Sequence, residues 1–323
     1  MKLLCSLLLA ASALCAHASG AALPAGITLV PGHWTPGGQP DGNSVLFDGP
    51  DGLVLLDTGR HVAHAQALIE AIRTRSTPLR WIVNSHWHLD HIGGNGLLRQ
   101  AFPQAKLMAS DAIVGARDGF LARYRAQLVE QLAGLAEGDA KRLPLLREIA
   151  IIDDRAAQTP DVSVQASGEQ TLAGRRLLVG LARDAATAGD VWLYDPQARV
   201  LAAGDLVTLP VPFLDTACAP RWSGALGTLA AQPFEQLIPG HGPVLTRAEF
   251  ERYRRGYDGL LQCAASSAAA PACISGWLDT LGPLVPEGDQ KLARAYLGYY
   301  LDEHLRAPPA KARAYCPKDA AGG

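Results

Sequence analysis

The chain has 323 residues, 48% of them hydrophobic, and this length and composition exclude a disordered or fibrous protein. Its 29 Lys and Arg residues nearly balance 31 Asp and Glu residues, which leaves a net charge of −2. This balance argues against a protein that binds nucleic-acid phosphates and favours a small-molecule partner. The composition does not fix an oligomeric state.

The amino terminus has the pattern of a secretory leader. Lys2 precedes the apolar residues 3–13, and the small-residue sequence Ala16-His17-Ala18 follows. A membrane-spanning helix needs about 20 apolar residues, so we expect cleavage here and no membrane span. Lipidation at Cys15 is a weaker alternative, because the residue before it is bulky. A leader over residues 1–18 predicts a periplasmic or secreted protein.

The first half of the chain predicts strands and helices in alternation. Residues 43–58 hold two short apolar runs around a Gly-Pro-Asp-Gly turn, which predicts a β-hairpin. Residues 61–75 carry apolar side chains at helical spacing, and 79–83 is an apolar run typical of a buried strand. Residues 111–150 mix apolar and charged side chains with few breakers, so we expect a helical insertion there.

The second half returns to short apolar segments between Gly and Asp-Pro turns. These segments predict four strands, over residues 162–164, 176–181, 191–194 and 200–203. From residue 247 onward the apolar spacing is helical, with a last helix around residues 290–305. The pattern as a whole predicts an α/β (α+β) protein that ends in helices.

Cleavage of the leader leaves four cysteines in a compartment that permits disulfides. Cys263 and Cys273 flank a run of small residues and are placed to close a short loop, which would leave Cys218 to pair with Cys316. The four cysteines allow three pairings, and four free buried thiols are a further alternative.

Four side chains able to bind metals lie within six residues directly after the strand at 79–83, in the sequence His86-Trp87-His88-Leu89-Asp90-His91. Imidazole nitrogen and carboxylate oxygen both suit Zn²⁺. A loop that leaves a strand end directs alternate side chains into one pocket. His86 and His88 are therefore expected to share one ion, while Asp90 and His91 turn toward a second.

This His-x-His-x-Asp-His segment resembles the metal-binding signature of the metallo-β-lactamase fold superfamily. Three further motifs are similar to family elements and stand in the family's order: Asp57-Thr58-Gly59, Gly204-Asp205 and Pro239-Gly240-His241-Gly242. The resemblance covers residues 43 to about 245 and implies a four-layer αββα sandwich. It divides the chain into a metallo-β-lactamase-like domain over 19–246, with its helical insertion at about 111–150, and a C-terminal helical extension over 247–323.

The resemblance also implies zinc as cofactor, with one or two ions per chain. The implied ligands form two sets, His86 and His88 for the first zinc and Asp90, His91 and His241 for the second, with Asp205 bridging them. Asp90 would also act in catalysis by orienting the attacking hydroxide. Asp57 would support a ligand imidazole from behind.

One family position is not met. Where the family usually has His-Thr-x-Gly-Asp, this chain has Ala186-Thr187-Ala188-Gly189-Asp190, and a methyl group cannot bind a metal. The first zinc would then keep His86, His88 and Asp205, which is still three protein ligands with an open position for water. Asp184, two residues before Ala186, is a candidate substitute ligand.

The resemblance therefore implies an exported hydrolase that uses a zinc-activated hydroxide on an ester, lactone, thioester or β-lactam bond. The stretch from Cys218 to Cys316 is also similar to exported metallohydrolases associated with quinoprotein systems. Because Ala186 removes a ligand, the alternative is a noncatalytic or accessory binding protein with a degenerate metal site. The sequence does not select among the substrates.

Overall fold

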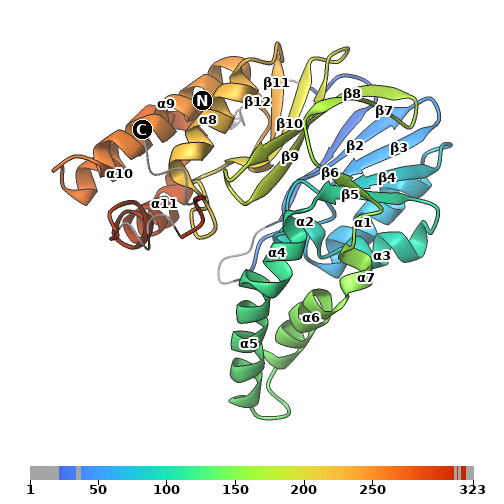
Figure 1. Cartoon of the computed structure of the whole chain (residues 1–323), viewed down its shortest axis with the longest axis horizontal. Helices are drawn as coiled ribbons and strands as arrows, with labels where there is room; N and C mark the ends of the chain where they lie inside the picture. Colours follow the sequence, from blue (N-terminus) through green and yellow to red (C-terminus); the bar gives the residue numbers. More distant parts are fainter. Residues whose placement is uncertain (1–21, 34–37, 309–310, 312–313, 318–323) are drawn as a thin grey trace, which may run out of the picture.

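The structure of the protein is a computed structural model, in which residues 22–33, 38–308, 311 and 314–317 are described. The predicted leader over residues 1–18 lies outside the described residues. Two six-stranded sheets face each other in Figure 1, with helices on the outer side of each. This arrangement confirms the predicted four-layer αββα sandwich.

The first sheet is built from the first half of the chain, in the strand order β1-β2-β3-β4-β5-β6. Its strands are β1 (Ile27–Val30), β2 (Ser44–Gly49), β3 (Gly52–Leu56), β4 (Leu79–Val83), β5 (Lys106–Ser110) and β6 (Val162–Val164). β1, β2 and β3 pair antiparallel, and β3 to β6 pair parallel. The hairpin predicted over residues 43–58 is β2 and β3.

The second sheet has the order β12-β11-β10-β9-β8-β7. Its strands are β7 (Gly168–Leu172), β8 (Arg175–Arg183), β9 (Gly189–Asp195), β10 (Val200–Thr208), β11 (Gln236–His241) and β12 (Leu245–Thr246). Only the pair β10 and β11 is parallel among these described strands. The helix that connects these two strands crosses the outer face of the sheet.

Helices cover the outer faces of both sheets and form the insertion. On the first sheet lie α1 (Val62–Arg73) and α3 (Asn95–Ala101), whereas α2 (Leu89–Ile92) packs against the insertion. The insertion contains α4 (Ala112–Asp118), α5 (Phe120–Ala133), α6 (Arg142–Asp153) and α7 (Arg155–Gln158). On the second sheet lie α8 (Ala219–Ala230) and α9 (Arg247–Ala264), while α10 (Ala270–Leu281) packs on α9 and α11 (Glu287–Tyr300) on α10, with short 3₁₀ and π turns at Gly282–Leu284 and Leu301–Leu305. Figure 1 shows α5 and α6 projecting away from the sheets. No helix of the described part of the chain has the length and apolar character to cross a membrane.

Both faces of the central strands are buried, and alternate side chains fill two different layers. On β3, Val54 and Leu56 pack between the sheets, whereas Leu53 and Leu55 pack against α1 and α3. A strand exposes successive side chains on opposite faces, so a continuous apolar run is required where both faces are covered. The helices after residue 247 pack on the outer face of the second sheet in one hydrophobic cluster. The division into domains at residue 246 stays a prediction.

Two disulfides join the cysteines, Cys263 with Cys273 and Cys218 with Cys316. This is the favoured one of the three pairings that four cysteines allow. The second bridge spans a sequence separation of 98 and fastens the end of the described chain to the loop before α8.

Loss of the long-range disulfide should destabilise the protein more than loss of the short one. A cross-link stabilises by restricting the unfolded chain, typically by about 2–4 kcal/mol, and the effect grows with the logarithm of loop length. We expect Cys218→Ser with Cys316→Ser to lower the free energy of unfolding in urea by about 2 kcal/mol more than Cys263→Ser with Cys273→Ser. Equal losses would contradict this expectation.

Candidate metal centre

The metal-capable motif lies where the first sheet meets the loop that enters α2. β4 ends at Val83, and His86 and His88 follow in the loop, while Asp90 and His91 lie in α2 itself. All four side chains are buried, and His91 is 0% exposed. Buried polar groups require partners, so the burial of four titratable side chains together indicates a site and not a solvated cluster.

Two further candidates come from the parallel strands of the second sheet. Asp205 lies within β10 directly after Gly204, where the pairing with β11 shifts register, and His241 ends β11. A Cβ atom at Gly240 would lie 2.0 Å from Oδ1 of Asp205. Glycine at position 240 is therefore needed for the carboxylate to occupy this place.

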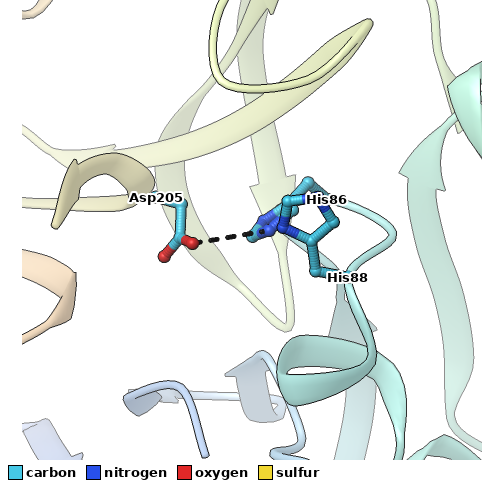
Figure 2. Close-up of side chains that lie close together, drawn as sticks. All are labelled: His86, His88 and Asp205. Atoms are coloured by element: carbon cyan, nitrogen blue, oxygen red, sulfur yellow. Dashed lines mark ion pairs between the residues drawn. The ribbon is translucent and has the colours of Figure 1, made fainter. Parts of the chain in front are cut away.

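The six side chains form two groups at the seam between the sheets. The potential ligand atoms of His86, His88 and Asp205 lie within 4.8 Å of one another, and so do those of Asp90, His91 and His241. These groups have the composition expected from the sequence. Figure 2 shows the first group, in which the carboxylate of Asp205 faces His86.

Asp205 faces both groups. Its Oδ2 lies 3.7 Å from Nε2 of His86, and its Oδ1 lies 3.2 Å from Nε2 of His91 and 3.6 Å from Nε2 of His241. On the other side of the second group, Oδ2 of Asp90 lies 3.0 Å from Nε2 of His241. Asp205 therefore has the position that a bridging carboxylate requires.

Three buried atoms at this centre make no hydrogen bond of acceptable geometry: Nε2 of His86, and Nε2 of His91 and Oδ1 of Asp205, which face each other as an ion pair. An unpartnered buried polar atom is costly, and each one in a folded protein calls for an explanation. Here all three belong to the two groups, and nitrogen and carboxylate oxygen are zinc ligands. The residues therefore fit a bound metal.

The charges of the centre also fit a cation. Burial opposes ionisation of Asp205, but His91 and His241 outweigh it and hold the pKa of the carboxyl below its usual value. Burial likewise disfavours protonation of His91, yet Asp205, Asp57 and Asp90 raise its pKa well above the ordinary histidine value. Burial lowers the pKa of His88 to about 4, so this ring is neutral and able to bind a metal at neutral pH.

Asp57 holds the ligand loop from behind. Its carboxylate lies 2.8 Å from Nδ1 of His91 and accepts hydrogen bonds from the backbone nitrogen of Ser85 at 2.7 Å and from the Ser85 hydroxyl at 2.6 Å. Because that hydroxyl donates to Asp57, it accepts from Nδ1 of His86 at 3.0 Å. Both imidazoles are thereby oriented with Nε2 toward the centre, which is the geometry expected of a supporting carboxylate.

Thr216 orients His88 and was not identified from the sequence. Its hydroxyl donates to the backbone oxygen of Ala186 at 3.0 Å and lies 3.0 Å from Nε2 of His88. A hydroxyl has one hydrogen, so Thr216 accepts from His88, and the free lone pair of the ring is on Nδ1. No sequence pattern indicates this contact, because Thr216 and His88 lie 128 positions apart.

The 185–190 loop supplies no ligand atom to either group. Ala186 is buried in the cluster beneath α8, and Asp184, the candidate substitute, belongs to neither group of the described residues. Asp184 has a φ of 55° at the turn that enters this loop. The first group therefore consists of two imidazoles and the shared carboxylate.

Asp190, which closes this loop, should make stability depend on pH. It accepts hydrogen bonds from the backbone nitrogen and the hydroxyl of Thr187, each at 2.9 Å, and burial raises its pKa to about 7. A raised carboxyl pKa means that the folded state holds a proton that the unfolded state has lost, so stability falls as pH rises from about 4 to 7. An asparagine side chain does not titrate, so the Asp190→Asn variant lacks this contribution to the pH dependence of stability.

We therefore expect the difference in unfolding free energy between wild type and Asp190→Asn to shift by roughly 2–4 kcal/mol in favour of the variant between pH 5 and pH 8. Urea denaturation at both pH values measures it. A difference that does not change with pH would contradict the protonated state of Asp190.

The sequence and the fold are similar to those of known proteins. A family model described as the metallo-beta-lactamase superfamily matches residues 37–245. The linear primary-alkylsulfatase of Pseudomonas sp. (strain ATCC 19151) is 24% identical over 232 residues, which cover 65% of this chain and 43% of that protein. The chain thus spans less than half the length of this curated relative.

Two solved structures share the fold. The metallo-beta-lactamase from Pontibacter korlensis matches with a TM-score of 0.53 at 20% identity, over 71% of this chain and 94% of that chain. A metallo-beta-lactamase family protein from Thermus thermophilus matches with a TM-score of 0.55 at 19% identity, over 84% of this chain and 90% of that chain. At these identities the likeness concerns the fold alone.

Proposed function

Since the chain belongs to the metallo-beta-lactamase superfamily, we propose that it is an exported zinc-dependent hydrolase acting on an ester, lactone, thioester or β-lactam bond. One observation carries the proposal. Nε2 of His86, Nε2 of His91 and Oδ1 of Asp205 are buried without a hydrogen bond of acceptable geometry and converge on one centre.

His86, His88 and Asp205 would hold one zinc, and Asp90, His91 and His241 the other, with Asp205 shared. When bound, zinc lowers the pKa of water to near 7 and polarises the bond under attack. The chain's own contribution is orientation. Asp57 fixes His91, and Thr216 fixes His88, so the ligand geometry is set before a metal arrives.

The number of zinc ions bound per chain depends on the first group. Without a side-chain ligand at Ala186 it offers three protein ligands, one of which is shared. Fewer ligands bind zinc more weakly, so we expect the second group to fill first and the first group to fill at higher free zinc.

Export is supported by the leader-like amino terminus and by the two disulfides, since disulfides persist in oxidising compartments. We therefore propose a periplasmic or secreted location. The similarity to exported metallohydrolases associated with quinoprotein systems stays a prediction.

Removal of metal should abolish hydrolysis, and zinc should restore it. The purified protein is dialysed against a chelator and then assayed on a chromogenic cephalosporin, an aryl ester, a lactone, a thioester and, because of the alkylsulfatase relative, a primary alkyl sulfate. We expect turnover of at least one compound, its loss on chelation and its recovery with Zn²⁺.

Two other outcomes would contradict the proposal. Turnover that survives complete metal removal would exclude zinc as the source of the activity. Zinc uptake without turnover of any of the five compounds would favour the alternative, a noncatalytic binding protein.

A further inference from the structure

A buried polar chain links the helical insertion to the second metal group. Arg60 follows the Asp57-Thr58-Gly59 turn, and its side chain is 10% exposed. The Tyr124 hydroxyl of α5 donates to Glu148 of α6, and Glu148 pairs with Nη1 of Arg60. Nη2 of the same guanidinium lies 3.8 Å from Oδ1 of Asp90. Arg60 therefore connects polar side chains of the insertion to a candidate ligand, beside the apolar packing of α2 against the same helices.

The two oxygens of Asp90 face different partners. Oδ2 lies 3.0 Å from Nε2 of His241 and 3.6 Å from Nε2 of His91, so this oxygen belongs to the metal group. Oδ1 faces Arg60 instead. Because the two oxygens are equivalent, a half-turn would restore both contacts, whereas a partial rotation of the carboxylate would move one oxygen out of the group and the other away from Arg60.

The backbone keeps Arg60 close to α2. Its backbone nitrogen donates to Oδ1 of Asp41 at 2.6 Å. A Cβ atom at Gly93 would lie 2.9 Å from Cα of Arg60, so glycine there permits the close approach of the two segments. The arginine is thus held at its main chain by Asp41 and at its head by Glu148.

We propose that Arg60 is a positioning residue that fixes the carboxylate of Asp90 for the second metal, and that Tyr124 and Glu148 of the insertion hold Arg60 in place. The inference rests on the proposed metal site. It gives the insertion a part in metal binding, although no side chain of α5 or α6 belongs to either metal group among the described residues.

Simple electrostatics predicts the opposite effect. A cation beside a metal site repels the metal, so removal of Arg60 alone should tighten zinc binding if its charge were all that mattered. Positioning predicts weaker binding, because a supporting partner typically contributes 10- to 100-fold in metal affinity. When Arg60 and Glu148 are removed together the net charge is unchanged, so electrostatics predicts at most slightly tighter zinc binding and only positioning predicts weaker binding.

The test removes the pair without changing net charge. Arg60→Met is combined with Glu148→Gln, because either change alone would leave a buried charge unpaired. The zinc affinity of the second group is measured by chelator competition in a His88→Gln background, which disables the first group. The control is Arg125→Gln with Asp153→Asn, which removes an exposed ion pair of the same two helices.

We expect about 10- to 100-fold weaker zinc binding in the Arg60 and Glu148 variant and no change in the control. In a His241→Gln background, where the first group remains, the same pair of changes should leave zinc affinity unaltered. A general loss of structure would weaken both groups, so this comparison separates positioning from a merely structural role. Tyr124→Phe is a milder variant for which we expect a smaller loss at the second group alone.

Unchanged or tighter zinc binding at the second group would overturn the inference. If the parent chain with Arg60 and Glu148 takes up no zinc, the proposed function fails and the inference falls with it. If the parent binds zinc and the variant binds it equally well, the inference alone fails.

Discussion

Asp205→Asn is expected to reduce zinc binding at both groups and to abolish hydrolysis. Asp205 faces His86 through one oxygen and His91 and His241 through the other. Asparagine keeps the shape of the side chain but loses its charge. Supporting residues alone contribute about 10- to 100-fold in affinity, so loss of a shared ligand should cost more than about 100-fold.

Chelator competition measures the affinity of each group, and the rate on whichever substrate proves active measures the chemistry. Asp258→Asn is a suitable control, since Asp258 accepts a hydrogen bond from Ser223 on α8 and belongs to neither metal group. Zinc affinity within about threefold of wild type at either group would show that Asp205 does not serve both, since a lost ligand should cost far more.

Asp57→Asn should weaken zinc binding at the second group by about 10- to 100-fold. The carboxylate accepts from His91 and from two donors of Ser85, and an amide can replace only one of its oxygens. Asparagine is the appropriate substitution because Asp57 has a φ of 61°, a conformation that asparagine tolerates better than alanine.

The variant should also unfold more readily, by about 1–3 kcal/mol, because a buried donor loses its acceptor. Zinc competition and urea denaturation measure the two effects separately. Asp48→Asn, at a more exposed site on β2, serves as the control. An unaltered zinc affinity in Asp57→Asn would mean that the ring of His91 is oriented by other contacts.

Much of the fold was predictable because its strands are buried on both faces. The strands at 79–83 and 162–164 have the predicted limits, and the hairpin and the helix after it lie where the apolar spacing places them. β7 was missed because Gly-Glu-Gln-Thr-Leu lies at an edge and carries no continuous apolar run. A half-exposed edge strand leaves little pattern in the sequence.

The candidate ligands come from one contiguous motif and two shorter ones, which supply Asp205 and His241. Of the residues that orient them, Asp57 was named from its motif, whereas Thr216 and Arg60 were not. Thr216 contacts His88 across 128 positions, and Arg60 contacts Glu148 across 88. Threonine, arginine and glutamate occur throughout the sequence, and no spacing rule shows which of them orients a ligand. Only the folded chain brings Thr216 next to His88 and Arg60 next to Glu148.

Each metal group takes two residues from the first half of the chain and one from the second. The first group takes His86 and His88 from the loop after β4 and the second takes Asp90 and His91 from α2, and each takes its third residue from β10 or β11, so neither half of the protein contains a complete group. A zinc ion at either position would act as a reversible cross-link between segments that lie far apart in the sequence. At a zinc concentration of about 100 times its dissociation constant, such a link would contribute roughly 2.7 kcal/mol toward keeping the two sheets together. In a chain cut between β5 and β10, zinc would then add to the apolar contacts between the sheets, so the halves should separate at a lower urea concentration with a chelator than with zinc.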